Sequence, residues 1–362
     1  MTQQITVFGF GAVGRRIVEI LAARGDRVRV ATRNLPADLP YGVEHMACDV
    51  LDAADVRRAL AGSAQAMLAV GFAYDSRLWK TVWPTTMTNL VEGCADAGTR
   101  LVLIDNLYQL GAKTKSRTED MALTPTGKKS AILADVSRIW QAAADRVRVA
   151  ALRCTDFYGP GVAVSHLGAS AFGEQAKGKP AQLLVPATIP HDFAYVPDIA
   201  RAAVVLLDAD DADFGQVWNM PCAPTRTPRE LLTIGAATLG ERLRVWAVPP
   251  GLLRPLGLFY RFAKEVADVG FTWIGHISWT VVSSRAALAS RQHRSRLASP
   301  PPFAPLRAIV EMAGTRHVRP ERPDLRNVVL AVLTALVGGD VVDQAILVGR
   351  SMTHCWTMTC TP

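Results

Sequence analysis

A glycine-rich segment near the N-terminus carries the clearest chemical signal in the chain. It reads Gly9-Phe10-Gly11-Ala12-Val13-Gly14 and directly follows a short apolar run at residues 5–8. In a segment of this form, the first glycine permits a tight turn, the second lets a pyrophosphate approach the backbone, and the third lets a helix pack closely on a sheet. The free N–H groups at the start of that helix attract phosphate. We therefore expect a dinucleotide to bind here, with a ligand-free glycine turn as the alternative.

Arg33 bears on which dinucleotide is bound. The next predicted strand ends in Ala31-Thr32-Arg33-Asn34, with no acidic residue at the position where one would bind the ribose 2′-hydroxyl of NAD. An arginine at this place can instead bind the 2′-phosphate of NADP. The sequence thus favours NADP over NAD, although a solvent-exposed loop arginine explains the residue equally simply.

Strands and helices alternate through the first half of the chain. Apolar or alternating runs predict strands at residues 5–8, 27–32, 66–70, 100–104 and 147–152, and helical periodicity predicts helices at 13–23, 53–60, 78–97 and 130–144. This alternation predicts an α/β fold, a doubly wound parallel (Rossmann) sheet covered by helices on both faces. We divide the chain into a dinucleotide-binding core (1–156), a smaller substrate-binding portion interleaved with that core (157–270) and a basic tail (271–362).

Further motifs follow the glycine segment in a characteristic order. They occupy residues 48–52, 105–111, 153–161 (Arg-Cys-Thr-Asp-Phe-Tyr-Gly-Pro-Gly), 191–200, 215–220 and 227–232. With them, residues 2 to about 268 resemble the extended and atypical short-chain dehydrogenase/reductase proteins, in particular the NAD-dependent epimerase/dehydratase family. The family has the motif at 153–161 after its sixth strand, whereas the five runs above make the preceding strand the fifth. One strand is therefore missing from the count, or a boundary is shifted.

The resemblance implies an NAD(P)-dependent oxidoreductase, epimerase or dehydratase that acts on a hydroxyl or carbonyl carbon of a small molecule. It places Asp49 and Val50 against the adenine of the cofactor. We also assign Val70 and Gly71, which end and follow the third predicted strand, to the cofactor site.

The catalytic centre departs from the family pattern. The family uses a Ser/Thr together with Tyr-x-x-x-Lys, in which the lysine lowers the pKa of a tyrosine that would otherwise be a poor base at neutral pH. Here Asn106 stands at the Ser/Thr position, Thr126 at the tyrosine and Ser130 at the lysine, with Lys129 one place early. Our catalytic candidates are therefore Asn106, Tyr108, Thr126 and Lys129. Other cations available nearby are Lys113, Lys115 and Lys128. The alternative is a non-catalytic NAD(P)-binding regulator or redox sensor.

Substrate-binding candidates come from the second half of the resemblance. The segment with Asp156, Phe157 and Tyr158 is expected near the nicotinamide end of the cofactor, and His191 and Tyr195 are further candidates. A purely structural turn, and a capping role for His191, remain the alternatives.

Composition excludes several other classes of protein. The six cysteines include no Cys-x-x-Cys pair, so we expect no metal site. No targeting segment and no apolar run of transmembrane length occurs, which favours a cytoplasmic protein without a membrane span. Of the net charge of +8, residues 285–326 alone carry +6, so the basic excess is not built into the fold and we expect no nucleic-acid partner. The expected partner is a small-molecule substrate, with a homodimer left open.

The tail after Trp273 does not continue the family pattern. It is rich in Arg, Ser, Ala and Pro, and shifting residues 274–280 by one nucleotide allows an Arg-Pro-Tyr-aliphatic-aliphatic-Asp string that the family often has there. Two interpretations stay open. The tail is either a frameshifted translation, or a basic linker followed by a short apolar helix from Val328.

Overall fold

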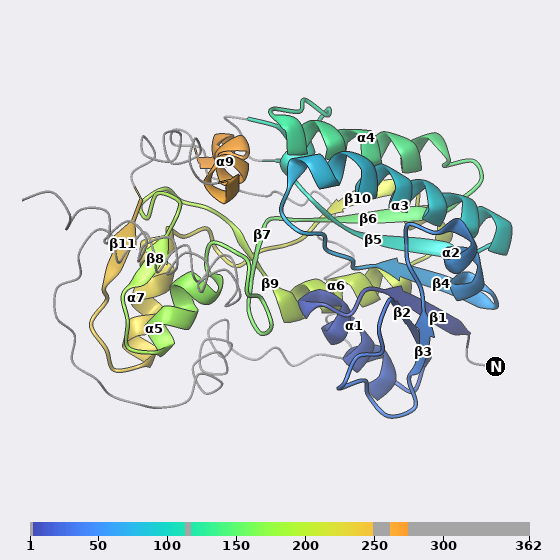
Figure 1. The fold of residues 1–362 in the computed structure, drawn as a ribbon, viewed down its shortest axis with the longest axis horizontal. Coiled ribbons are helices and arrows are strands. Elements are labelled where there is room, and N and C mark those ends of the chain that lie inside the picture. The colour runs from blue at the N-terminus through green and yellow to red at the C-terminus, as the bar shows by residue number, and fades with distance from the viewer. Residues whose placement is uncertain (1–2, 113–116, 249–260, 274–362) are drawn as a thin grey trace, which may run out of the picture.

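The computed structural model describes residues 3–112, 117–248 and 261–273, so the tail after Trp273 lies outside the described residues. Its centre is a parallel sheet of seven strands (Figure 1). In spatial order these are β10 (Gln216–Asn219), β6 (Val149–Cys154), β5 (Arg100–Asn106), β4 (Ser63–Leu68), β1 (Gln4–Phe8), β2 (Arg27–Thr32) and β3 (Glu44–Ala47).

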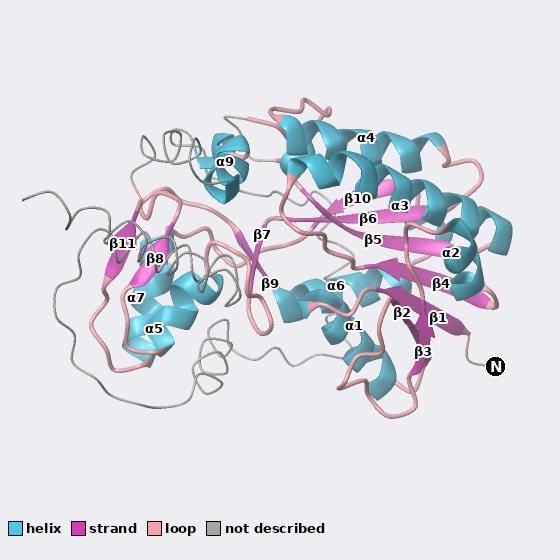
Figure 2. Cartoon of the chain, in the orientation of Figure 1, coloured by secondary structure: helices cyan, strands magenta, loops and turns pink. Residues whose placement is uncertain are grey.

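Helices cover both faces of this sheet (Figure 2). One face carries α1 (Ala12–Ala23) and α6 (Val196–Leu207), and the other carries α2 (Ala53–Leu60), α3 (Ser76–Ala97) and α4 (Lys128–Ala142). Each face has its own apolar core, because the sheet residues alternate between the two sides. The predicted doubly wound α/β fold is confirmed.

Two strands of the main sheet, β3 and β10, were not among the predicted strands. The one that precedes residue 153 in the chain is β3. Its residues Glu44–Ala47 are all at least partly exposed, since β3 is the edge strand beside β2. An edge strand of this kind lacks the apolar run that marks a buried strand. With β3 counted, β6 becomes the sixth strand, as the family resemblance requires.

Several strand boundaries also differ from the expected ones, among them those of β4 and β6. β4 begins at Ser63 rather than at residue 66, because polar residues at its start are buried and paired. Ser63 Oγ lies 2.7 Å from Thr6 Oγ1, and Gln65 Nε2 donates to Leu207 O over 2.7 Å. β6 spans Val149–Cys154 instead of 147–152. Hydrophobicity alone therefore did not predict the start of β4, because its buried residues there are polar and have internal hydrogen-bond partners.

The order of the strands reverses between β1 and β4. From β1 the chain moves outward to β2 and β3, and it then crosses to β4 on the other side. In open α/β sheets a ligand binds at such a switch point, beyond the carboxyl ends of the strands. Here the two strand ends lie in contact, because Ala69 N donates to Phe8 O over 2.8 Å.

A smaller portion with its own apolar core lies beside the sheet (Figure 1). It contains the two-stranded sheet of β8 (Ala181–Leu183) and β11 (Val245–Ala247), with η2 (Gly168–Gly173), α5 (Glu174–Ala176) and α7 (Pro228–Thr238). The parallel pair β7 (Asp156–Tyr158) and β9 (Phe193–Tyr195) joins this portion to the main sheet. The remaining described elements are η1 (Tyr108–Leu110), η3 (Asp211–Asp213), α9 (Arg261–Asp268) and η4 (Gly270–Trp273). No helix within the described ranges is long and apolar enough to cross a membrane.

Candidate active site

The glycine segment forms the turn between β1 and α1 at the switch point. Gly9 has φ +96°, and a Cβ at this position would lie 2.7 Å from Ala69 O. A Cβ on Gly14 would overlap the carbonyl oxygen of Gly9, so α1 can approach the turn only with glycine there. A Cβ on Gly11, in contrast, would meet no atom within 4 Å. The turn is therefore tight on its protein side and open at Gly11, which fits the close approach of a pyrophosphate to the start of a helix.

The ends of β2 and β3 lie beside this turn. Cys48 N donates to Thr32 O over 3.1 Å, which brings Asp49 next to the strand end that carries Arg33. Arg33 is exposed and forms no ion pair with a described residue. Asp49 Oδ1 accepts from Leu51 N over 3.0 Å, so this carboxylate shapes its own turn. The expected adenine-side residues thus share one edge of the sheet.

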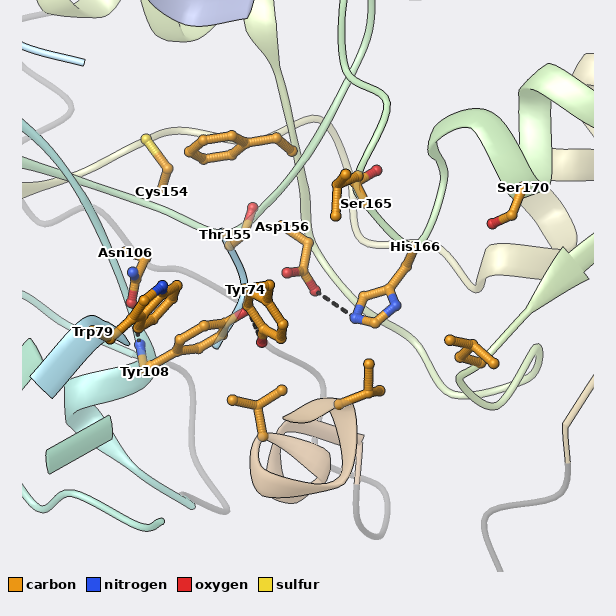
Figure 3. A pocket seen from close by; sticks show the side chains of 15 residues that line it. Tyr74, Trp79, Asn106, Tyr108, Cys154, Thr155, Asp156, Ser165, His166 and Ser170 are labelled. Atoms are coloured by element: carbon orange, nitrogen blue, oxygen red, sulfur yellow. Dashed lines mark hydrogen bonds and ion pairs between the residues drawn. The ribbon is translucent and has the colours of Figure 1, made fainter. Parts of the chain in front are cut away.

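A cavity of about 220 Å³ opens where β5 and β6 end and β7 begins (Figure 3). Its lining includes Tyr74, Trp79, Asn106, Tyr108, Cys154, Thr155, Asp156, Phe157, Val164, Ser165, His166, Ser170, Leu184, Val266 and Val269. The loop after β7 links the cavity to the glycine turn, because a Cβ on Gly161 would lie 3.3 Å from Ala12 Cβ. The cavity and the turn that is open at Gly11 therefore lie at the same edge of the sheet.

Two tyrosines and an asparagine form one wall of the cavity. Asn106, at the end of β5, accepts from Tyr108 N through Oδ1 over 2.8 Å, which fixes η1 against the strand end. The Tyr108 and Tyr74 hydroxyls lie 3.4 Å apart. Burial is the main cause that raises the pKa of both phenols, so both stay protonated at neutral pH. This wall can donate hydrogen bonds to a substrate oxygen.

The residues at the family's expected tyrosine and lysine positions make structural hydrogen bonds. Thr126 is exposed, accepts from Ala112 N through Oγ1 over 3.3 Å, and does not line the cavity. Ser130 Oγ donates to Tyr108 O and accepts from Thr126 N. Both side chains hold the segment before α4 against η1.

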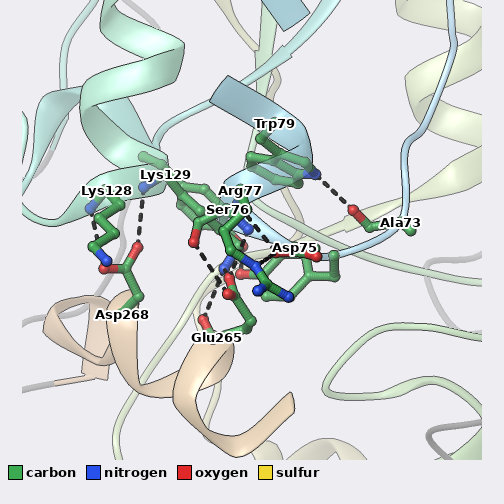
Figure 4. A network of polar contacts seen from close by, with 11 residues as sticks. Ala73, Asp75, Ser76, Arg77, Trp79, Lys128, Lys129, Glu265 and Asp268 are labelled. Carbon is green, nitrogen blue, oxygen red and sulfur yellow. Dashed lines mark hydrogen bonds and ion pairs between the residues drawn. The ribbon is translucent and has the colours of Figure 1, made fainter. Parts of the chain in front are cut away.

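Lys129 points toward α9 rather than into the cavity (Figure 4). Its side chain is fully buried and its Nζ forms an ion pair with Glu265. The same Nζ lies 4.3 Å from the centroid of the Tyr74 ring, a cation–π geometry. Burial lowers the pKa of Lys129, and Glu265 opposes that shift. Glu265 also accepts from Ser76 N over 2.9 Å, so it ties α9 to the start of α3.

Asp268 of α9 caps α4 from outside the helix. Its two carboxylate oxygens each accept a hydrogen bond of 3.0 Å, from Lys128 N and Lys129 N. The residue that precedes α4 in the chain, Gly127, has no side chain to do this. A negative charge at this end also interacts favourably with the helix dipole.

We expect Asp268→Ala to lower the free energy of unfolding by about 1 kcal/mol, the usual cost of a lost N-cap. Urea unfolding measures this loss in the free energy of unfolding. Asp135→Ala is the matched control, because Asp135 and Arg138 form an exposed pair on the same helix α4. The control should change the free energy of unfolding by less than about 0.5 kcal/mol. Equal effects in the two variants would show that Asp268 does not cap α4.

Opposite the tyrosines, a carboxylate lies between two imidazoles. Asp156 Oδ2 is 2.9 Å from His191 Nε2 and 3.8 Å from His166 Nε2. Trp273 stacks on His191 with ring centroids 4.1 Å apart and meets His166 edge-on at 5.4 Å. Burial on its own would raise the pKa of Asp156, but the two histidines outweigh it and the pKa is lowered. Burial lowers the pKa of His166, against the attraction of Asp156.

The cavity brings together only part of the residue set expected from the sequence. Asn106, Tyr108, Asp156 and Phe157 line it. Residues expected there that do not line it are Thr126, Lys129, Tyr158, His191 and Tyr195. His191 is buried behind Asp156, while Tyr158 and Tyr195 pack on each other with ring centroids 5.2 Å apart. Lys113 and Lys115 lie outside the described residues.

Sequence reasoning missed three features of the site. Tyr74 and His166 come from loops that carry no motif, and Glu265 contacts Lys129 across 136 residues of sequence. A pattern of spacing along the chain cannot reveal such contacts. Within the described ranges, no group of His, Cys, Asp or Glu could hold a metal ion.

Solved structures with the same fold come from several bacteria. The dTDP-glucose 4,6-dehydratase DesIV of Streptomyces venezuelae, solved with NAD and TYD bound, is 18% identical, with a TM-score of 0.66 and coverage of 85% of this chain and 96% of that one. WbmH of Bordetella bronchiseptica, solved with NAD+, is 16% identical, with a TM-score of 0.65 and coverage of 86% and 98%. The UDP-N-acetylglucosamine 4-epimerase of Bacillus cereus is 15% identical, with a TM-score of 0.65 and coverage of 88% and 99%.

The sequence comparisons point the same way. No curated protein matches the chain. The profile of the NAD dependent epimerase/dehydratase family matches residues 5–220, which include the glycine turn, Asn106, Tyr108 and the segment around Asp156. The chain therefore belongs to the NAD dependent epimerase/dehydratase family.

Proposed function

We propose that the protein is an NAD(P)-dependent oxidoreductase, epimerase or dehydratase that acts on a hydroxyl or carbonyl carbon of a small molecule. One observation carries this proposal. The turn that is open at Gly11 and the cavity lined by Asn106, Tyr108 and Asp156 lie at the same edge of the sheet, joined by the loop at Gly161. A bound nicotinamide cofactor would supply the hydride acceptor or donor.

The residues that would hold the cofactor lie around the switch point. The pyrophosphate would lie against the glycine turn, which consists of Gly9, Phe10, Gly11, Ala12, Val13 and Gly14. The adenine would lie against Asp49 and Val50. The segment beside the turn, Val70 and Gly71, would also contact the cofactor. The family name and the NAD-bound neighbours DesIV and WbmH support a cofactor of this kind. In the cavity, Asn106 and Tyr108 would hold the substrate by hydrogen bonds.

Arg33 is proposed to select NADP over NAD. It is exposed at the end of β2 beside Asp49, where it can reach a 2′-phosphate without losing an existing ion pair to a described residue. Arg33→Glu should weaken NADP binding at least about tenfold, because a carboxylate repels the phosphate. NAD binding should stay the same or improve. The measurement is calorimetric titration of both nucleotides, and equal losses for NAD and NADP would contradict the assignment.

Turnover tests the enzymatic part of the proposal. The full chain is mixed with NADPH or NADH and a panel of small cyclic and aryl ketones and aldehydes, and the loss of reduced nicotinamide absorbance is followed. Turnover of at least one carbonyl compound is the expected result. Tight cofactor binding without turnover of any compound would favour the alternative, a non-catalytic NAD(P)-binding regulator or redox sensor.

A further inference from the structure

The cavity lining includes titratable side chains that are not part of the family's Tyr-x-x-x-Lys pattern. Any hydroxyl–carbonyl interconversion needs a side chain that takes the hydroxyl proton or returns it. Five side chains in the described lining can titrate: Tyr74, Tyr108, Cys154, Asp156 and His166. The choice among them follows from their surroundings.

The tyrosines are poorly placed to act as bases. Burial raises the pKa of Tyr74 and Tyr108. The cation that could counteract this shift, Lys129, lies over the face of the Tyr74 ring and is paired with Glu265. Burial also raises the pKa of Cys154 well above its ordinary value. These three groups therefore stay protonated at neutral pH.

His166 has the surroundings of an acid/base histidine. Its Nε2 faces Asp156, and its side chain keeps 17% of its surface exposed at the cavity wall. Asp156 in turn is held by His191, and the Trp273 ring contacts both imidazoles. A carboxylate behind one ring nitrogen stabilises the imidazolium that forms when the other nitrogen takes a proton. Figure 3 shows His166 and Asp156 facing each other across from Tyr74 and Tyr108.

We propose that His166, supported by Asp156, exchanges the proton with the substrate hydroxyl in place of the family's Tyr–Lys pair. This inference rests on the proposed function. In oxidation, the O–H bond of the substrate breaks and its proton moves to the free ring nitrogen of His166, while the C–H hydride is taken up by the nicotinamide cofactor, leaving the carbonyl. Reduction runs the same transfers in reverse. Asp156 and His191 are positioning residues.

A first test needs no substrate. The histidine ring signals of the 15N-labelled full chain are titrated by NMR, and His166 is assigned as the signal lost in His166→Gln. Its pKa should lie below the ordinary histidine value of about 6.5, because burial disfavours the charged form. The pKa should fall further in Asp156→Asn, since Asp156 opposes that shift and His191 reinforces it. A His166 pKa that Asp156→Asn leaves unchanged would overturn the proposal, because Asp156 would then not act on His166.

The second test measures turnover of a carbonyl compound that the proposed screen identifies as a substrate, in two matched variants. His166→Gln should lower kcat at least about 100-fold, the usual contribution of a general acid/base, with the cofactor Kd unchanged. Tyr108→Phe should cost less than about tenfold, as expected for the loss of one hydrogen bond. The reverse ranking would assign the proton transfer to Tyr108 and overturn the proposal. If no cofactor binds, the proposed function itself fails. Cofactor binding without turnover of any carbonyl compound would overturn the proton transfer by His166.

Discussion

Replacing Gly11 with alanine should weaken NAD(P) binding strongly and leave the fold intact. Gly11 has φ −77° and ψ −165°, an extended conformation that alanine adopts without strain. The added Cβ meets no protein atom within 4 Å, so it projects into the open space of the turn. In the proposed cofactor site, this is where the pyrophosphate approaches the backbone. Calorimetry should show at least about tenfold weaker binding, and thermal unfolding should show an unchanged Tm.

Gly14→Ala is the matched control. The same added methyl group would overlap the carbonyl oxygen of Gly9, so α1 must move away from the turn. We expect a loss of about 1–3 kcal/mol in the free energy of unfolding, as for other overpacked sites. If Gly11→Ala bound the cofactor as tightly as the original chain, the pyrophosphate would not lie at this turn.

Replacing Glu265 with glutamine should destabilise the protein strongly. Lys129 is fully buried, and the substitution removes the carboxylate that compensates its ammonium group. Breaking a buried ion pair by removing one partner costs about 3–5 kcal/mol. The contacts from Glu265 to Ser76 would weaken as well, which loosens α9 from α3. Urea unfolding measures the change.

The pH dependence and a double variant check this explanation. Burial lowers the pKa of Lys129 even with Glu265 present. Without Glu265 the unfolded state binds a proton that the folded state does not retain, so stability should rise as the pH increases from 7 toward 10. Lys129→Met combined with Glu265→Gln removes the buried charge and should recover most of the lost stability. A loss in Glu265→Gln below about 1 kcal/mol, unaffected by pH, would contradict a charged Lys129 in the fold.

The sequence predicted the features of this fold that depend on local pattern. The alternation of strands and helices and the glycine turn need only neighbouring residues, and both are present. β3 was missed because an exposed edge strand has no apolar run. The start of β4 was missed because Ser63 and Gln65 are buried polar residues with internal partners.

The candidate site was predictable only where it lies on family motifs. Asn106, Tyr108 and Asp156 follow strands of the main sheet, and they reach the cavity because parallel strands end at one edge. Lys129 was expected near the cofactor, but its side chain lies against α9, whose distance in sequence hides the contact. His166 was not a candidate, since it stands in a loop and depends on Asp156 and Trp273 for its surroundings. Tertiary contacts of this kind leave no mark in residue spacing.

Calorimetric titration of NADP, NADPH, NAD and NADH into the full chain tests the central claim most directly. We expect at least one of them to bind one-to-one with a micromolar Kd, and NADP(H) to bind more tightly than NAD(H) because of Arg33. Binding of none of the four would contradict this account. It would show that the open glycine turn at the switch point is a structural feature of this chain and not a cofactor site.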